Sequence, residues 1–391
     1  MKKPNSTLSG FGTTIFEVMT RLALENNAIN LGQGFPDGGY PEDVLEAAAD
    51  AIFVGSNQYP PMLGTPDLRR AVSDHLAQIY GLETDWQTET LITSGATEAL
   101  ASTFLALIEP GDEVIVLEPL YDCYIPLIKR AGGVPVSVRL TPPDWSLPAK
   151  ELEAAFSERT KLILINSPMN PTGKVFAATE LAFIAELVRK WDAFAVCDEV
   201  YEHLVFDSLR HIPLITLPGM RERTVRIGSA GKTFSLTGWK VGYVSGPADM
   251  IRPIAKAHQF LVFTTPPNLQ SAVAYGLRKE EHFFRTLAQP LEQKRDRLRR
   301  GLESVGMQTL DCGGTYFLVA DIGAMGWEDG DVEFCKFLVE NAQVAAVPMS
   351  AFYQDEGPSR YVRFAFCKQD SILDEAVDRL TRQFSATSLT V

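Results

Sequence analysis

The chain has 391 residues, 46% of them hydrophobic and 22% charged, a composition typical of a globular protein large enough for two domains. Its formal net charge of −13 would repel nucleic acid and anionic lipid, so we expect neither as a main partner. The five cysteines are scattered and form no Cys-x-x-Cys pair, which argues against a metal site or a disulfide framework.

The sequence contains no segment typical of a membrane span or an export signal. No uninterrupted apolar run approaches the ~20 residues that cross a bilayer. The first ten residues, MKKPNSTLSG, contain two lysines but no apolar stretch after them. We therefore expect a cytoplasmic protein that has no membrane partner.

The middle of the chain alternates short apolar runs with longer amphipathic stretches such as Glu98–Ile108 and Thr179–Lys190. Apolar strands interleaved with helices predict an α/β fold with a mostly parallel seven-stranded sheet between helices. In such a sheet, ligands bind at the carboxyl ends of the strands. The predicted strands are Thr90–Thr93, Glu113–Leu117, Val134–Val138, Lys161–Asn166, Phe194–Cys197, Thr224–Ile227 and Val241–Ser245.

The pattern changes after about residue 285. It predicts a smaller α+β domain formed by residues 286–391, with the N-terminal segment 1–44 packing on it, and a large domain formed by residues 45–285. The elements expected in the smaller domain are helices over Leu291–Val305, Val332–Asn341 and Ser371–Phe384 and strands over Thr315–Ala320, Val344–Val347 and Arg360–Phe366.

A candidate catalytic lysine lies in the stretch RIGSAGKTFSLTGWKVGY, which runs from Arg226 to Tyr243. An apolar strand there ends in small residues that bring Lys232 to the carboxyl edge of the predicted sheet. Desolvation at such an edge lowers the pKa of a lysine, so that its amine becomes nucleophilic enough to form a Schiff base. A phosphate-binding loop of the GxxxxGK[ST] type is the alternative, but that loop requires glycine at position 226.

Two other loops carry candidate polar residues. Asp198 ends an apolar strand in FAVCDEVYEH, and Tyr201 follows three residues later. A buried carboxylate needs a cationic partner, which a protonated pyridine nitrogen would provide, although an aspartate here equally suits the cap of a following helix. Asn170 lies in NSPMNPTGKV, at a turn fixed by two prolines, and by itself this pattern indicates only a loop.

The segment SGATEAL follows the predicted strand TLIT and begins a helix near Glu98. Free N–H groups at a helix N-terminus bind phosphate, so Gly95, Ala96 and Thr97 are candidate phosphate ligands. Ser229 and Lys240, which flank Lys232, would add a hydroxyl and a positive charge.

Together, the segments NQY, SGATEAL, EPLYDCY, NPTGKV, DEVYEH, SAGKTFSLTGWKVGY and RFAF resemble the class I and II aminotransferases, pyridoxal 5′-phosphate (PLP) enzymes of fold type I. The resemblance covers nearly the whole chain, and it is greatest to kynurenine/glutamine aminotransferases and bacterial methionine aminotransferases. It implies a transaminase that moves the amino group of an L-amino acid to a 2-oxo acid.

The resemblance assigns a role to each candidate residue. Lys232 would hold the cofactor as a Schiff base and then carry the proton to and from the substrate Cα. Asp198 would pair with the pyridine nitrogen, while Asn170 and Tyr201 would hydrogen-bond to the phenolic oxygen. The other implied cofactor contacts are the ring of Tyr121, which would stack on the pyridine, and the phosphate ligands Gly95, Ala96, Thr97, Ser229 and Lys240.

The implied substrate contacts include Arg363, whose guanidinium would bind the carboxylate. The strand pattern of YVRFAF alone predicts a surface arginine. Arg363 points away from Val362, Phe364 and Phe366, and that face of a strand is ordinarily exposed to solvent. The remaining implied substrate contacts are Gly34, Ile15, Tyr124, Asn170 and Phe263.

The resemblance also implies a homodimer, in which Tyr59 would reach the phosphate of the neighbouring subunit and Phe263 would line its substrate pocket. In addition, it implies cis peptide bonds at Glu118–Pro119 and Asn170–Pro171. The chain departs from many relatives at Lys240, where they have arginine, and at Ile15, where they have an aromatic residue.

The residues that the resemblance places around the substrate side chain are all non-basic, so we expect a large neutral amino donor, such as methionine, glutamine or an aromatic amino acid. They are Ile15, Tyr59, Tyr121, Tyr124 and Phe263. The sequence leaves two alternatives open. A PLP-dependent C–S β-lyase would use the same cofactor and lysine for another reaction. A ligand-sensing module would keep the fold without catalysis.

Overall fold

The structure is a computed structural model that describes residues 2–387. Its largest element is a seven-stranded sheet with the order β2-β8-β7-β6-β5-β3-β4, in which β8 alone runs antiparallel to its neighbours. This sheet confirms the predicted α/β class and contains all seven predicted strands. They are β2 (Thr90–Thr93), β3 (Glu113–Glu118), β4 (Val134–Arg139), β5 (Thr160–Asn166), β6 (Phe194–Asp198), β7 (Thr224–Ser229) and β8 (Gly242–Ser245).

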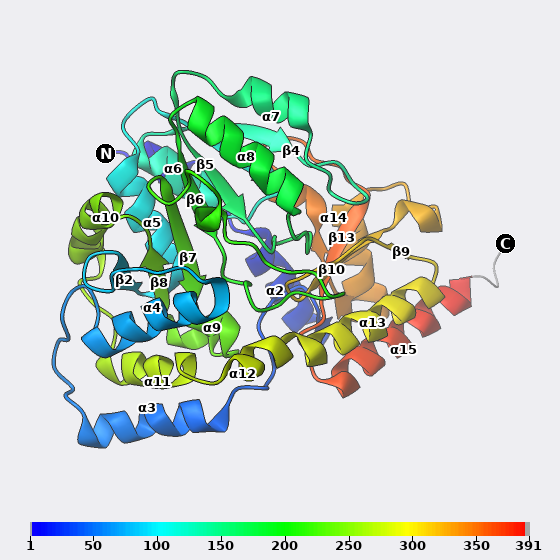
Figure 1. Cartoon of the computed structure of the whole chain (residues 1–391). Helices are drawn as coiled ribbons and strands as arrows, with labels where there is room; N and C mark the ends of the chain where they lie inside the picture. The colour runs from blue at the N-terminus through cyan, green and yellow to red at the C-terminus, as the bar shows by residue number, and fades with distance from the viewer. Residues whose placement is uncertain (1, 388–391) are drawn as a thin grey trace.

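Helices cover both faces of this sheet because successive side chains of a strand point to opposite sides. On β3, Val114 and Val116 pack with α5, α6 and α10, whereas Ile115 and Leu117 pack with α7 and α8. Helices α3, α4 and α11 pack together beside β2 and β8 (Figure 1). The helices are α3 (Glu42–Val54), α4 (Pro66–Tyr80), α5 (Gly95–Leu107), α6 (Tyr124–Ala131), α7 (Ala149–Ala155), α8 (Ala178–Lys190), α9 (Ala230–Thr233), α10 (Ala248–Leu261), α11 (Pro267–Leu277) and α12 (Glu281–Thr286).

The residues at the helix ends explain where these helices begin and stop. The hydroxyl of Thr65 accepts a hydrogen bond from the N–H of Leu68 at 3.3 Å, Pro66 occupies the first turn of α4, and Gly81 ends the helix at φ +65°. Helix α5 begins differently, because its N-cap residue Ser94 makes no side-chain capping bond. The first N–H groups of α5 therefore have no capping side chain and are available to a ligand.

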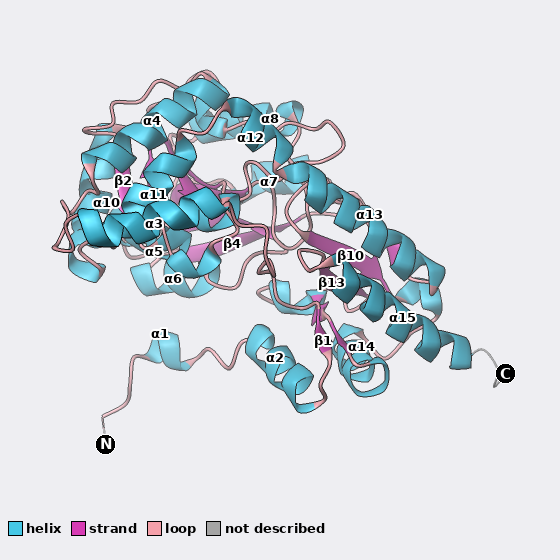
Figure 2. Ribbon diagram, turned by 90° about the horizontal axis from the view of Figure 1, so that it is seen from below, coloured by secondary structure: helices cyan, strands magenta, loops and turns pink. Residues whose placement is uncertain are grey.

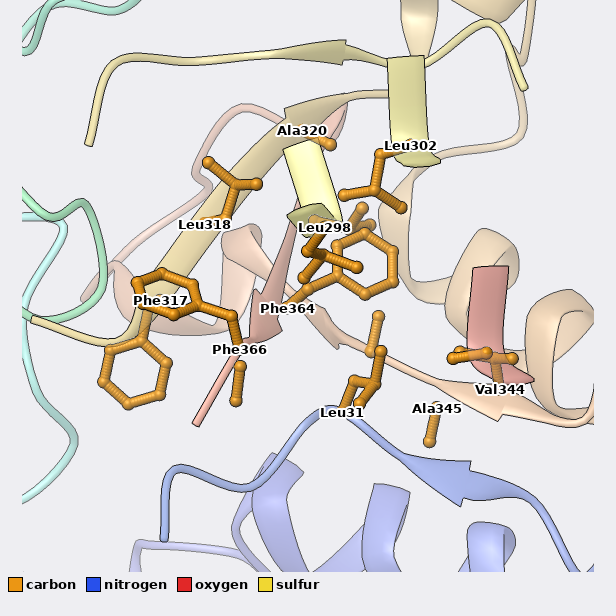
Figure 3. Packing of buried hydrophobic residues seen from close by; sticks show 14 of the residues in the cluster. Leu31, Leu298, Leu302, Phe317, Leu318, Ala320, Val344, Ala345, Phe364 and Phe366 are labelled. Carbon is orange, nitrogen blue, oxygen red and sulfur yellow. The ribbon is translucent and has the colours of Figure 1, made fainter. Parts of the chain in front are cut away.

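The C-terminal part of the chain forms a second, four-stranded antiparallel sheet with the order β12-β13-β10-β9. Leu298 and Leu302 of α13 pack on Leu318 of β10 and Phe364 of β13, as Figure 3 shows. The elements are β9 (Gln308–Thr309), β10 (Phe317–Asp321), β12 (Val347–Pro348), β13 (Tyr361–Ala365), α13 (Ala288–Ser304), α14 (Asp331–Phe337) and α15 (Asp370–Thr387).

Two predicted elements of this part differ in detail. The segment predicted as one strand over Val344–Val347 is divided, because β11 (Val344–Ala345) pairs with the N-terminal strand β1 (Ile29–Asn30) while β12 pairs with β13. The helix predicted over Val332–Asn341 is α14 followed by the π-helix η4 (Leu338–Ala342).

The N-terminal segment crosses from one sheet to the other. Helices α1 (Ser6–Ser9) and α2 (Ile15–Glu25) precede β1, and α2 lies beside α14 (Figure 2). The chain then passes the carboxyl edge of the large sheet before α3 begins at Glu42 and packs on α11. This path brings residues 32–35 to the end of the strands where ligands bind in α/β folds.

None of the helices in residues 2–387 combines the length and apolarity that crossing a bilayer requires. The peptide bonds Glu118–Pro119 and Asn170–Pro171 are cis, as expected.

Candidate active site

A cavity of about 540 Å³ lies at the carboxyl ends of the large-sheet strands, where the N-terminal segment and the four-stranded sheet meet them. Strands that are far apart in sequence each deliver one polar group here: Asn166 ends β5, Asp198 ends β6 and Ser229 ends β7. The residues from our sequence analysis that line the cavity are Gly34, Gly95, Ala96, Thr97, Tyr121, Tyr124, Asn170, Asp198, Tyr201, Ser229, Lys232, Lys240 and Arg363.

Lys232 extends into this cavity from the short helix α9. Its Nζ donates a hydrogen bond to the hydroxyl of Tyr316 at 2.8 Å. Burial lowers the pKa of Lys232 from its ordinary value of 10.5 to about 8, although Cys367 and Asp198 oppose the change. About a tenth of the amine is therefore neutral at pH 7, which favours nucleophilic attack.

Asp198 lies buried at the end of β6, only 4% exposed. Tyr124 donates a hydrogen bond to its Oδ2 at 2.6 Å, and the N–H of Val200 lies 3.4 Å from its Oδ1. Burial raises the pKa of Asp198 to about 6 in spite of these bonds and of the attraction of Lys232. The next residues form turns and no α-helix, so the alternative of a helix cap is wrong.

Arg363 is buried at 1% exposure, and its guanidinium lies 3.9 Å above the ring of Phe317. Its Nη1 donates to Asn170 Oδ1 and its Nη2 to the carbonyl of Gly32, both at 2.8 Å, while its Nε has no partner in the described chain. Burial lowers the pKa of this arginine to about 10. The strand-pattern prediction of a solvent-facing arginine is therefore wrong. A buried cation with an unpaired donor beside a cavity suits an anionic ligand such as a carboxylate.

The N-terminus of α5 forms one wall of the cavity. The helix begins at Gly95 and not near Glu98, so Gly95, Ala96 and Thr97 make up its first turn and their N–H groups lack intrahelical partners. A Cβ added to Gly95 would lie 3.4 Å from Nζ of Lys240, so an ammonium group sits beside this turn. Helix dipole and lysine together make this wall suitable for a phosphate.

The polar groups that line the cavity match the aldehyde, the ring nitrogen and the phosphate of PLP. A nucleophilic amine at Lys232 suits the aldehyde carbon, and a buried carboxylate without a bonded cation at Asp198 suits a protonated ring nitrogen. The first turn of α5 suits the phosphate, and Tyr121 supplies an aromatic ring to the lining of the same cavity.

Three residues from the sequence analysis do not line this cavity. Ile15 packs between two apolar clusters, and its neighbour Phe16 lines the cavity. Tyr59 and Phe263 lie outside the cavity, 85% and 39% exposed, with their ring centroids 5.6 Å apart.

Sequence reasoning missed several contacts of this site. Tyr124 lines the cavity, and its hydroxyl is bonded to Asp198, a contact that the sequence did not indicate. Tyr316, which was not singled out, contacts Lys232 directly. The sequence offers little local signal for either, since these partners are separated by 74 and 84 residues.

A second buried cluster lies behind the turn that carries Asp198 and Tyr201. Arg226 donates to carboxylate oxygens of Glu199 and Glu202, at 2.7 Å in both cases, and all three side chains are nearly inaccessible to solvent. Arg226, which stands where a phosphate-binding loop would need glycine, thus pairs with two buried carboxylates at once.

The chain also resembles proteins of known function. A family model described as "Aminotransferase class I and II" matches residues 26–380. The chain is 46% identical over 387 residues to a probable N-succinyldiaminopimelate aminotransferase of Mycobacterium tuberculosis, covering 96% of this chain and 97% of the relative. It is 40% identical over 377 residues to the methionine aminotransferase of Escherichia coli, with 96% and 97% coverage.

Solved structures agree with these similarities. The structure of N-succinyldiaminopimelate aminotransferase from Mycobacterium tuberculosis superimposes with a TM-score of 0.94 at 46% identity, covering 97% of this chain and 100% of that one. An Escherichia coli protein with methionine aminotransferase function superimposes with a TM-score of 0.94 at 40% identity, covering 98% and 100%.

Proposed function

The chain belongs to the class I and II aminotransferases, which depend on PLP, and on that basis we propose that its amino donor is a large neutral L-amino acid. When bound, PLP supplies an electron sink that stabilises negative charge developing at the substrate Cα. The amino group then passes to a 2-oxo acid.

The charges around the cavity support this proposal most directly. Among the described lining residues, Lys232, Lys240 and Arg363 are the positively charged ones. The proposed roles of these three are to react with the cofactor, to hold its phosphate and to bind the α-carboxylate. No further lining cation is then available for a second carboxylate, which disfavours aspartate as the donor.

The apolar part of the lining supports the same proposal. Phe16 and Phe317 offer aromatic surface near Arg363, and Phe35 also lines the cavity, which suits an apolar or aromatic side chain. The relatives named above act, by their names, on N-succinyldiaminopimelate and methionine, and another relative is a rat kynurenine–oxoglutarate transaminase, 39% identical over 398 residues. Of these three donors, methionine and kynurenine suit the aromatic lining best.

The proposed work of the chain's own residues follows from their positions. Arg363 would hold the substrate carboxylate while Asn170 and the Gly32 carbonyl fix the plane of its guanidinium. The amine of Lys232 would take the proton from Cα, and Asp198 would keep the ring nitrogen protonated. We also propose that Tyr201 and Asn170 contact the phenolic oxygen and that Ser229 joins the phosphate ligands.

We propose that the active unit is a homodimer. Phe53, Val54, Tyr59 and Phe260 are more than four-fifths exposed, which is unusual for large apolar side chains and indicates a surface that a second copy covers. Tyr59 and Phe263 would then complete the partner's site. We also propose a large domain formed by residues 45–285 and a smaller one formed by residues 1–44 together with 286–391. The proposed location is cytoplasmic, which suits the free thiols of the described cysteines.

A panel of amino donors tests the donor proposal. Methionine, glutamine, phenylalanine, kynurenine and aspartate would be assayed against several 2-oxo acids, and the first four should include the donor with the highest kcat/KM. The highest kcat/KM with aspartate would contradict the proposal. The relatives do not favour the C–S β-lyase alternative, and turnover that requires no 2-oxo acid would be its signature.

A further inference from the structure

Tyr316 joins three parts of the chain at the edge of the active-site cavity. It immediately precedes β10 in the C-terminal part and is 1% exposed. Its hydroxyl oxygen receives a hydrogen bond from Nζ of Lys232 at 2.8 Å, and the same hydroxyl donates to the carbonyl of Gly34 at 2.7 Å. The lysine, the C-terminal sheet and the N-terminal segment thus meet at one oxygen atom.

The donor and acceptor roles at this oxygen are determined. A tyrosine hydroxyl has one proton, and the carbonyl of Gly34 can only accept it. The oxygen of Tyr316 must therefore accept from Lys232, which it does whether the amine is neutral or protonated.

The oxygen is also fixed in space. The ring of Tyr316 packs edge-on against the ring of Tyr201, with centroids 5.2 Å apart at 90°, and against Phe317 at 4.8 Å. A Cβ at Gly34 would collide with the rings of Tyr316 and Phe317, so the backbone of Gly34 lies directly on them. The position of the hydroxyl is therefore set by packing and not by the lysine.

We infer that Tyr316 is a positioning residue for Lys232: its hydroxyl holds the ε-amino group at the edge of the cavity whenever this group is not covalently engaged, ready to take the Cα proton. This inference rests on the proposed function of the site. Without the hydroxyl, the end of a four-carbon side chain would sample several rotamers in the cavity, and fewer of them would be aligned for proton transfer.

The same contact couples the base to the carboxylate-binding group. Gly32 and Gly34 belong to one short segment, and the carbonyl of Gly32 accepts from Arg363 at 2.8 Å while that of Gly34 accepts from Tyr316. A substrate held by Arg363 would thereby be placed relative to Lys232 through two hydrogen bonds on carbonyls two residues apart. Tyr316 itself does not line the cavity, so it acts through Lys232.

The variant Tyr316→Phe removes the oxygen and keeps the ring. The first readout uses full-length, cofactor-free protein, in which acetic anhydride labels the neutral form of Lys232 and peptide mass spectrometry gives its rate against pH. An acceptor stabilises the protonated amine, so its loss should lower the titration midpoint of Lys232 by about one pH unit and make labelling at pH 7 about fivefold faster.

The second readout is a single-turnover half-reaction of PLP-loaded protein with the best donor of the panel, protiated or deuterated at Cα. Loss of positioning should slow this step about tenfold and raise its isotope effect, while the apparent dissociation constant of the donor changes little. The two readouts move in opposite directions, which a change of pKa alone would not produce. Tyr243→Phe is the matched control, because it removes another buried hydroxyl, bonded to Glu202 at 3.2 Å, and should leave both readouts at wild-type values.

An unchanged labelling midpoint in Tyr316→Phe would overturn the inference, as would a half-reaction that becomes faster in step with the labelling. Absence of any half-reaction in the wild-type protein would overturn the proposed function instead. The labelling readout needs no turnover, so it would still decide whether Tyr316 holds Lys232.

Discussion

The hydrogen bond from Tyr124 to Asp198, the residue proposed to face the cofactor's ring nitrogen, can be tested by removing the tyrosine hydroxyl. The hydroxyl donates at 2.6 Å to a buried carboxylate. A hydrogen bond to the charged form lowers the pKa of an acid, so Tyr124→Phe should raise the pKa of Asp198 above its present value of about 6. Such a bond contributes about 1.5–3 kcal/mol, which corresponds to one or two pH units.

The free energy of unfolding of cofactor-free protein, measured in urea from pH 4 to 8, reports this shift. Burial holds the pKa of Asp198 above its ordinary value of 3.8, so the ionised carboxylate destabilises the fold by about 3 kcal/mol above pH 6. This penalty is absent below pH 3.8 and grows as the pH rises to the folded-state pKa. In Tyr124→Phe this penalty should keep growing up to about pH 7–8. The difference between the free energies of unfolding of wild type and variant, here called the deficit of the variant, should therefore widen above pH 6.

Tyr243→Phe provides the control for this measurement as well. It also removes a hydroxyl that donates to a buried carboxylate, that of Glu202, whose pKa Arg226 and the nearby histidines hold well below the ordinary range in spite of burial. Its deficit should stay constant between pH 6 and 8. Parallel deficits for the two variants over that range would refute the electrostatic role of Tyr124.

Three other substitutions have expected outcomes. Asp198→Ala should still bind PLP, because the phosphate wall remains, yet lose most transaminase activity; near-normal turnover would remove Asp198 from the mechanism. Arg363→Met should lower kcat/KM for amino acids about 10²–10³-fold without changing cofactor affinity in a spectroscopic titration, since only the carboxylate loses its partner. Arg226→Met leaves Glu199 and Glu202 buried without their cation and should reduce the free energy of unfolding at pH 7 by about 3–5 kcal/mol, and a urea midpoint equal to that of the wild type would contradict this.

The fold could be predicted from the sequence because its signals are local. The central strands β3, β5 and β6 contain continuous apolar runs, and most of the polar residues that line the cavity lie at or just after the carboxyl ends of β2, β3, β5, β6 and β7. Ligands in α/β folds bind at the carboxyl ends of the strands. This rule places Lys232, Asp198 and the first turn of α5 together without knowledge of their contacts.

The errors arose where the tertiary structure overrides a local pattern. Arg363 is on the strand face that alternation assigns to solvent, but Phe16 and Phe352 from other parts of the chain cover it. Phe16 was not singled out in the sequence, although it lines the cavity; a one-residue step on a helix turns a side chain by about 100°, which separates it from Ile15. The partners of Tyr124 and Tyr316 depend on long-range packing, for which the sequence gives no periodic signal.

The central claim is that Lys232 is the residue that binds the cofactor covalently. The most direct measurement is borohydride reduction of PLP-loaded protein followed by peptide mapping. We expect a phosphopyridoxyl group on Lys232 and none on Lys240, whose ammonium lies beside the proposed phosphate site. A label on Lys240 or on any other lysine, or no label on protein that holds PLP, would contradict it.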